Sequence, residues 1–533
     1  MEENRPAKIE FKEWILDSVH GYIGITEAEK KIIDLPLFRR LQKIKHLSLV
    51  NLIFPGAEHT RYTHSLGVMH LADQVALTIG LDVDARRLLR LAGLLHDIGH
   101  YPLSHVGETV YQNYLEHKDF VLAHHKHDKA MFEEIIGVQP DHGVNVQKYH
   151  HEKIGATIIA NYKALHQILD IYYSDLGGKN LLTPKIGYII TGTYPNDYPD
   201  IHPLIQIIHS ELDVDRMDYL LRDSTFCGTG FGGAEVGKLV RHIQLSGDGR
   251  YIGIDSRGIS AADQFLINRF FANTQILANR DVASLEYMAE AVLWYATLKG
   301  GYGLLKPDEF DEACRRPDLP GNERNLMAYT DLAFWNAVQL IVEKSDQIQK
   351  EPDELFSDEN RRCIPAFAEK LLYHKSLKAV DHSTQTRCQM KASDTYALIA
   401  ETSEHKAFEA NLNGAEFPGK ITMMHTNSVT KLLVWEDYKK TLPELHPAMR
   451  PEKRAEAKET IATSMEKRLR EGILVIGYMG NIDPILLVDA PNSLMHTLYS
   501  MRHVVIRQYD FPGMEPEPTI EPSTHETPAP PAH

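Results

Sequence analysis

The chain has 533 residues, of which 43% are hydrophobic and 24% are charged, and its formal net charge is −16. This length exceeds one ordinary hydrophobic core, so about two or three structural units are expected. The negative charge argues against broad nucleic-acid binding. Four scattered cysteines form no CxxC pair, which favours a reducing, cytoplasmic setting over a disulfide framework. Because no run of about 18 apolar residues occurs, no membrane span is expected.

Helix-like spacing of apolar residues dominates the first part of the chain. It predicts helices over residues 26–46, 63–79 and 84–98. Gly99 is expected to end the third helix. His64 then lies at the start of one helix, and His96 and Asp97 lie at the end of the next. At helix ends, side chains can converge on an ion without disrupting core packing.

Residues 112–150 are polar and rich in histidine. The histidines are His117, His124, His125, His127, His142 and His150. We interpret this segment as a solvated insertion. The alternative, a second metal site, would need ligands at regular spacing on rigid elements, and His124, His125 and His127 offer only a cluster.

The later part of the chain is mixed in character. A long helix is expected over 203–223, a β-hairpin over 241–256, helices over 260–298, strand-like runs at 430–435 and 473–488, and a charged helix near 451–470. From residue 512 onward there are seven prolines, four glutamates and no Lys or Arg. We interpret residues 512–533 as a disordered tail.

The segment LLHDIGHYPLSH, residues 94–105, carries the strongest chemical signal. Asp97 directly follows an apolar run, where burial of a carboxylate is costly without a partner. On the predicted helix 203–223, Asp215, Tyr219 and Asp223 share one face because they are spaced four residues apart. Imidazole and carboxylate ligands suit a divalent metal with an open coordination position. Taken singly, each of these residues is more often structural or solvated, so the inference depends on reading the segments together.

Three ordered segments resemble the motifs of the HD-domain phosphohydrolases, and most closely those of the dNTP triphosphohydrolase branch. They are RYTHSLGV, LLHDIGHYPLSH and DVDRMDYLLRD. The segments DSVHGYIGIT, LPLFRRLQKIKHL and FPGAEHTRYTHSLGV extend the similarity, which covers residues 14–300. It implies a mainly α-helical HD core with a small β-hairpin. We expect an HD domain over 1–300, a mixed α/β region over 301–511 and the tail beyond.

The resemblance also assigns roles to individual residues. It implies that the metal ligands are His64, His96, Asp97 and Asp215. Residues that line the water and the scissile phosphate are His100, His105, Glu108 and His151. Phosphate contacts are Arg61, Arg216 and Arg269, and contacts near the sugar are His46, Leu47, Tyr219 and Asp223. At position 108 the family typically has aspartate, so glutamate is a longer equivalent.

The same resemblance, together with the chemistry of the ligand set, indicates which cofactor and partners to expect. Two imidazoles and two carboxylates suit one Fe, Mn or Zn ion, with Mg or Ni as alternatives. A second metal ion that holds the substrate phosphates is left open. We expect a nucleoside triphosphate substrate and a homo-oligomer, either a dimer or a tetramer. Membrane and nucleic-acid partners are not expected.

The sequence departs from the family pattern near the sugar and at the activator site. His46 stands where the vertebrate enzyme has glutamine, and Leu277 stands where it has a tyrosine that selects deoxyribose. Of the residues that would bind an activating nucleotide, Asp34 matches, whereas Gln42 and Glu13 do not. Neither selection of deoxyribose nor activation by GTP therefore carries over to this chain.

The preferred hypothesis is hydrolysis of dNTPs to a deoxynucleoside and triphosphate. One alternative is the same site acting on a ribonucleotide, an alarmone, a modified nucleotide or a nucleic-acid end. Another is a non-catalytic nucleotide sensor. His105 and His151 argue against a sensor, because nucleotide binding alone does not need groups that activate water.

Overall fold

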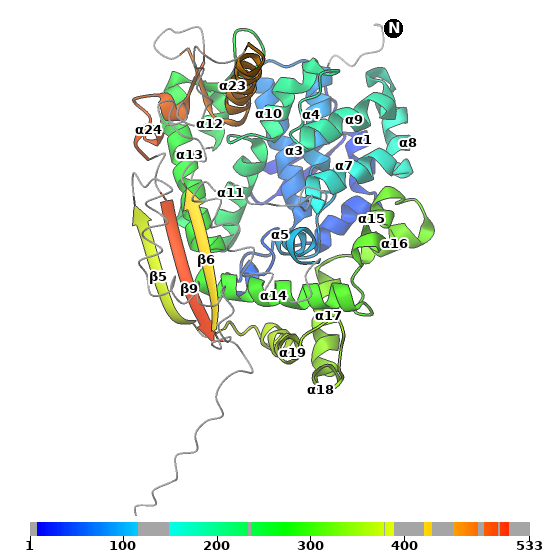
Figure 1. Ribbon diagram of the computed structural model, residues 1–533. Coiled ribbons are helices and arrows are strands. Elements are labelled where there is room, and N and C mark those ends of the chain that lie inside the picture. The colour runs from blue at the N-terminus through cyan, green and yellow to red at the C-terminus, as the bar shows by residue number, and fades with distance from the viewer. Residues whose placement is uncertain are drawn as a thin grey trace, which may run out of the picture.

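The computed structural model is a helical body with strands along one side (Figure 1). It describes residues 8–115, 149–232, 236–377, 379–387, 420–428, 451–477, 484–498 and 502–510. Most of the predicted histidine-rich insertion, the strand-like run 430–435 and the predicted tail lie outside these residues. Within the described ranges, no helix combines the length and the apolar sequence needed to cross a bilayer.

Two buried helices lie at the centre of the molecule. They are α3 (Arg61–Thr78) and α4 (Val83–Leu95), which pack against each other. Close packing needs glycine at position 93, because a Cβ there would lie 3.0 Å from the Cα atom of Met69. The two predicted helices are confirmed. However, α4 ends at Leu95, so His96 and Asp97 lie on the turn that follows.

Further helices surround this pair (Figure 1). They are α1 (Glu27–Ile33), α5 (His105–Thr109), α7 (His151–Asn161), α8 (Lys163–Tyr172), α9 (Gly178–Ile190), α10 (His202–Ile208), α11 (Val214–Cys227) and α12 (Val236–His242). α11 packs on α3, and α7 packs on α9. The histidine and aspartate motifs therefore meet between α3, α5, α7 and α11.

The predicted helix over 26–46 is interrupted. It divides into α1, α2 (Pro36–Arg39) and the 3-10 turn η1 (Arg40–Lys43). A proline begins α2, and Leu35 before it adopts an extended conformation with φ −62° and ψ 137°. Because the residue before a proline is disfavoured in the α conformation, the chain must break here. The prediction of one continuous helix is wrong.

The predicted helix over 203–223 is also two helices, α10 and α11. Between them, the side chain of Asp213 accepts a hydrogen bond of 2.8 Å from the backbone N–H of Arg216 and so caps α11. Asp215, Tyr219 and Asp223 all lie on α11, so they still share one face of a single helix.

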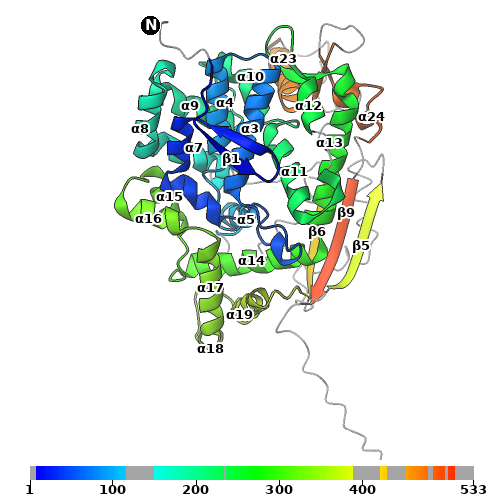
Figure 2. The same ribbon diagram turned by 180° about the vertical axis from the view of Figure 1, so that it is seen from behind.

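An N-terminal hairpin was not expected from the sequence. β1 (Glu13–Asp17) pairs antiparallel with β2 (Gly21–Ile25), and Asp17 faces Gly21 at the turn. Figure 2 shows this hairpin lying across the outer side of α3. It brings Asp17 and His20 toward the centre of the molecule.

The later strands form two sheets. The predicted hairpin over 241–256 is confirmed as β3 (Ile243–Leu245) and β4 (Ile252–Asp255), and the strand-like run 473–488 contains β7 (Leu474–Ile476) and β8 (Ile485–Leu486). These four strands make one sheet in the order β3-β4-β7-β8, in which β4 and β7 are parallel. A second sheet has the order β5-β9-β6. Its strands are β5 (Ala379–Arg387), β6 (Lys420–Ser428) and β9 (Arg502–Asp510).

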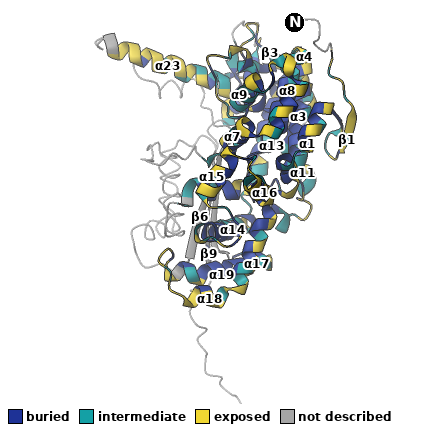
Figure 3. Ribbon diagram, turned by 90° about the vertical axis from the view of Figure 1, so that its right-hand side faces the viewer, coloured by how far each residue is buried: buried dark blue, intermediate teal, exposed yellow. Residues whose placement is uncertain are grey.

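Helices connect and flank these sheets. They are α13 (Ile259–Ala272), α14 (Arg280–Lys299), α15 (Pro307–Arg315), α16 (Pro320–Ala328), α17 (Asp331–Glu343), α18 (Ser345–Lys350), α19 (Asp358–Leu372), α23 (Pro451–Glu471) and α24 (Met495–Leu498). The π-helical turn η9 (Asn273–Leu277) joins α13 to α14. Figure 3 shows α23, the predicted charged helix, projecting from the body with much of its length exposed.

The prediction of a mainly α fold with a small hairpin and a mixed C-terminal region is confirmed. One cluster of buried apolar side chains includes both Leu95 of the predicted first domain and Phe367 of α19. The division into domains at residue 300 stays a prediction.

We predict that Arg90→Met destabilises the protein. The buried Arg90 side chain binds Glu29 at 2.6 Å, Asp73 at 3.1 Å and the carbonyl of Gly24 at 2.7 Å. Its loss leaves buried carboxylates without their cation and should lower the free energy of unfolding by about 3–5 kcal/mol. Chemical denaturation measures this, with the exposed Arg315→Met as control. Equal effects of the two changes would contradict the prediction.

Candidate active site

Four predicted metal ligands converge from three segments. His64 lies on the first turns of α3, His96 and Asp97 directly follow α4, and Asp215 lies in the first turn of α11. The Nε2 atoms of His64 and His96 are 3.3 Å apart. The distances are 2.9 Å from His64 Nε2 to Asp215 Oδ1 and 3.3 Å from His96 Nε2 to Asp97 Oδ1. The ligand atoms of His64, His96 and Asp97 lie within 4.8 Å of one another, close enough to share one ion.

Hydrogen bonds orient both imidazoles toward the centre of this cluster. His64 Nδ1 donates to Asp218 Oδ2 at 2.7 Å, and His96 Nδ1 donates to the carbonyl of Gly93 at 2.8 Å. With both Nδ1 atoms acting as donors, the two Nε2 atoms carry lone pairs that face each other. Ligand histidines in metal sites typically have this arrangement. The donor set therefore fits a divalent cation.

The carboxylates around His64 favour a positive charge at this point. Burial disfavours the charged imidazole, but Asp215 and Asp218 outweigh it and raise the pKa of His64 to about 10. For Asp97, burial alone would raise the carboxyl pKa. Arg61 and the neighbouring histidines instead hold it well below its usual range. The cluster therefore has an excess of negative charge that a metal ion would balance.

A buried network behind His64 was missed by the sequence analysis. Asp218 accepts hydrogen bonds from His20 at 2.6 Å and from Arg222 at 2.8 Å, and Arg222 also binds Asp17 at 2.9 Å. A Cβ at Gly67 would lie 1.8 Å from Asp218 Oδ1, so the glycine in HSLGV makes room for this carboxylate. The available signal was the spacing of three between Asp215 and Asp218. The distant partners left no pattern in the sequence.

Two predicted catalytic histidines share one carboxylate. Glu108 accepts from His105 Nδ1 at 2.8 Å and from His151 Nδ1 at 3.0 Å. Glu108 also accepts the backbone N–H of His151 at 2.9 Å. Burial alone would lower the pKa of His151, but Glu108 raises it above the ordinary value. Because Glu108 acts through the two imidazoles, it is a positioning residue.

Because Gly99 has no side chain, the start of α7, which carries His151, can pack directly against the turn that follows α4. A Cβ at Gly99 would lie 2.2 Å from the carbonyl oxygen of His151. The ring of His100 stacks on that of His151 with centroids 4.0 Å apart, and His100 Nε2 lies 3.4 Å from Asp97. His100 thus connects the metal cluster to the histidine pair from a buried position.

A second buried cluster surrounds Asp223. Its Oδ1 atom accepts from His59 Nε2 at 2.8 Å and from His46 Nδ1 at 3.2 Å. The ring of His46 lies 4.4 Å from that of His64, so this cluster adjoins the metal ligands. His59 was missed by the sequence analysis, and its hydrogen bond helps to hold Asp223 in place.

The three predicted phosphate-binding arginines have different positions. Arg61 is buried and donates to Asp97 at 3.0 Å and to Ser104 at 3.0 Å. Arg216 binds Asp213 and the carbonyl of Ser210, and Arg269 binds Glu211 at 3.0 Å. Of the three, Arg61 alone lines the cavity described next, so contacts of Arg216 and Arg269 with phosphate stay a prediction.

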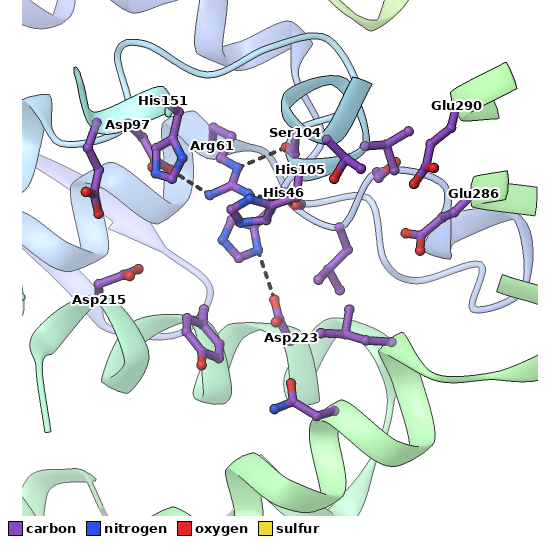
Figure 4. A pocket seen from close by; sticks show the side chains of 18 residues that line it. His46, Arg61, Asp97, Ser104, His105, His151, Asp215, Asp223, Glu286 and Glu290 are labelled. Atoms are coloured by element: carbon purple, nitrogen blue, oxygen red, sulfur yellow. Dashed lines mark hydrogen bonds and ion pairs between the residues drawn. The ribbon is translucent and has the colours of Figure 1, made fainter. Parts of the chain in front are cut away.

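A cavity of about 380 Å³ opens beside these clusters (Figure 4). Its lining includes the predicted residues Arg61, Asp97, His105, His151, Asp215, His46, Leu47, Tyr219, Asp223 and Leu277. The lining also includes Ser48, Asn273, Glu286 and Glu290, which the sequence analysis did not assign to a site. The volume lies within the usual range for sites that bind small organic molecules.

Comparison with known proteins agrees with this geometry. The HD domain family matches residues 61–223. An uncharacterized protein of Methanocaldococcus jannaschii is 33% identical over 257 residues, which are 48% of this chain and 43% of that protein. The deoxynucleoside triphosphate triphosphohydrolase SAMHD1 of Homo sapiens is 30% identical over 221 residues, which are 40% of this chain and 33% of that protein. The chain thus spans about half or less of these relatives.

Solved structures show the same fold over nearly the whole chain. A phosphohydrolase from Bacteroides thetaiotaomicron has a TM-score of 0.55 at 19% identity and covers 93% of this chain and 99% of its own. A hypothetical protein from Aquifex aeolicus has a TM-score of 0.59 at 19% identity and covers 94% and 96%. Residues 61–223 therefore match an HD domain, and the chain is similar in part of its sequence to deoxynucleoside triphosphate triphosphohydrolases and in its fold to these solved structures.

Proposed function

We propose that the protein is a metal-dependent hydrolase that converts dNTPs to a deoxynucleoside and triphosphate. The observation that carries this proposal is the convergence of His64, His96, Asp97 and Asp215 beside a cavity lined by His105 and His151. Human SAMHD1, whose name states this activity, supports the choice of substrate class. A cluster made only for stability would not need exposed imidazole at a cavity wall, and 65% of the His105 side chain is exposed.

The metal site has a defined ligand set. A divalent ion held by His64, His96, Asp97 and Asp215 would supply Lewis acidity and acidify water. Mixed imidazole and carboxylate ligands favour Fe, Mn or Zn, with Mg or Ni as alternatives. Whether a second ion accompanies the substrate phosphates is left open.

Side chains of the protein are proposed to bind the phosphate, orient the attacking water and hold the proton for the leaving oxygen. Arg61 is fixed by Asp97 and Ser104 and presents positive charge to the α-phosphate. Water attacks the α-phosphorus, the bond to the 5′-oxygen breaks, and the leaving oxygen takes a proton. His151, whose pKa Glu108 raises, is suited to hold that proton. His105, held by the same carboxylate, orients the attacking water.

The residues proposed to contact the sugar line the same cavity as the catalytic groups. Tyr219 and Asp223 line the cavity together with His46 and Leu47 and are proposed to contact the deoxyribose. Ribonucleotide hydrolysis is a second candidate, because Leu277 also lines the cavity and 42% of it is exposed. A homo-oligomeric state and a cytoplasmic location stay predictions.

We predict that His105→Ala and His151→Ala each lower kcat by about 10²–10⁴, the usual contribution of a general acid or base. Release of triphosphate and deoxynucleoside from each dNTP is the measurement. Metal content should persist, because neither residue is a proposed ligand. His242→Ala, which affects the separate pair with Asp255, is the control. Near wild-type turnover in either variant would remove that residue from the mechanism.

We predict that Asp218→Ala weakens metal binding by about 10- to 100-fold, the usual effect of losing a group that orients a ligand. His64 would lose the acceptor that fixes its Nδ1 proton and turns Nε2 toward the cluster. Competition with a chelator of known affinity measures the effect. The exposed Asp200→Ala is the control, since Asp200 binds only Lys185 among described side chains. Equal metal affinity in the two variants would contradict the orienting role.

We predict measurable hydrolysis of ribonucleotides beside dNTPs. A leucine in place of a ring near the sugar leaves a pocket that tolerates a 2′-hydroxyl, and such pockets discriminate by only about 10²-fold. Leu277→Tyr should sharpen the preference for deoxyribose. Parallel kcat/KM values for ATP and dATP, and for GTP and dGTP, measure it. A wild-type preference far above about 10³ would show that Leu277 does not set sugar selection.

A further inference from the structure

The cavity has two chemically opposite ends. At one end lie Arg61, His105 and His151 beside the proposed metal ligands. At the other end, Glu286 and Glu290 project from α14, and Figure 4 shows their carboxyl groups side by side, well apart from Asp215. They are four residues apart and therefore share one face of the helix. The proposed mechanism uses neither glutamate.

Glu286 lacks a cationic partner in the part of the chain that the structure describes. It is half-buried, and within the described ranges its carboxyl group makes neither a hydrogen bond nor a salt bridge. Burial and the nearby Glu290 raise the pKa of Glu286 to about 8. Near neutral pH the pair therefore carries one negative charge, and its one proton is shared between the two neighbouring carboxyl groups (Figure 4), which leaves the other oxygens as acceptors.

Ser48 is an independent sign that a polar ligand fits here. Its side chain lines the same cavity, the residue is 6% exposed, and its hydroxyl has no hydrogen-bond partner among the described residues. Buried hydroxyls are normally satisfied. Asn273, at the start of the π-helical turn, adds an amide to the lining. The cavity wall thus offers several polar groups that a bound molecule would satisfy.

Charge fixes the orientation of a nucleotide in this cavity. Phosphates at the glutamate end would meet like charge, whereas at the other end they would meet Arg61, the imidazoles and the metal ion that would balance Asp97 and Asp215. With the sugar between Tyr219 and Asp223, the base points toward Glu286 and Glu290. This step rests on the proposed function, since it takes a nucleoside triphosphate as the ligand.

We propose that Glu286 and Glu290 form a nucleobase subsite that selects bases with an exocyclic amino group. The amino group of cytosine, adenine or guanine donates N–H bonds that carboxyl oxygens accept. Thymine and uracil place a carbonyl oxygen where cytosine has its amino group. That oxygen is an acceptor, and the carboxyl oxygens that do not hold the shared proton offer it only lone pairs. The subsite therefore disfavours dTTP and dUTP.

The most direct test compares dCTP with dUTP, which have the same sugar and triphosphate and differ in the exocyclic group, amino or oxo, and in N3, an acceptor in cytosine and an N–H donor in uracil. With the metal-loaded full chain, kcat/KM should favour dCTP by about 10- to 100-fold, the usual cost of leaving a polar group without its hydrogen bond. The kcat/KM for dATP should likewise exceed the kcat/KM for dTTP. Equal values for dCTP and dUTP, or a preference for dUTP, would overturn the proposal without any variant.

A double variant assigns the preference to the two glutamates. In Glu286→Gln/Glu290→Gln the new amide N–H groups can donate to the uracil carbonyl, so the ratio should fall to about threefold or less. Asp281→Asn/Glu312→Gln makes the same two kinds of amide substitution outside the cavity lining and should keep the wild-type ratio. An unchanged dCTP to dUTP ratio of kcat/KM in the glutamine variant would show that other residues select the base.

Failure of the proposed function can be told apart from failure of this inference. If no nucleotide is hydrolysed, the hydrolase proposal fails. Equilibrium binding of dCTP and dUTP to the metal-loaded protein then still measures the subsite. Tighter binding of dCTP, lost in the glutamine variant, supports it, and equal binding of both nucleotides overturns it.

Discussion

Two imidazole nitrogens that face each other across 3.3 Å, with carboxylates on both sides, set the main constraint on this structure. Such a cluster is stable only if a cation occupies it or protons replace the cation. The surroundings reflect this requirement. Arg61 and Arg222 balance the buried Asp97 and Asp218, and Gly67 lets α11 approach α3. Much of the helical packing around α3 and α11 therefore serves to hold negative charge around one point.

The residues of this centre could be singled out from the sequence because they stand in short ordered segments, whereas their roles as metal ligands, which the family resemblance implies, stay a prediction. The spacing between His96, Asp97 and His105, and the helical spacing from Asp215 to Asp223, follow from neighbours along the chain. Contacts between distant segments had no such signal. His20 reaches Asp218 across 198 positions, and nothing in either segment indicates the pairing. The helix break at Asp213 was missed because a capping aspartate looks the same as a solvated one on a helix face.

The glutamates of α14 were missed for a related reason. In the sequence they are two charged residues on an apolar helix, and acidic residues on helices usually face solvent. The π-helical turn before α14 lines the same cavity, and such turns are rare and often occur at functional sites. The cavity thus joins an end that suits phosphate to an end that suits a donor-rich base, and the proposed sugar contacts lie between them.

Metal content measures the central claim most directly. Elemental analysis of the purified full chain, before and after reconstitution with Fe, Mn or Zn, should find about one divalent ion per chain, because two imidazoles and two carboxylates converge at this site. The double variant His96→Ala/Asp97→Ala should bind none at this site. No stoichiometric metal in the reconstituted wild type, or equal metal content in the wild type and the double variant, would contradict the assignment of this cluster as a metal centre.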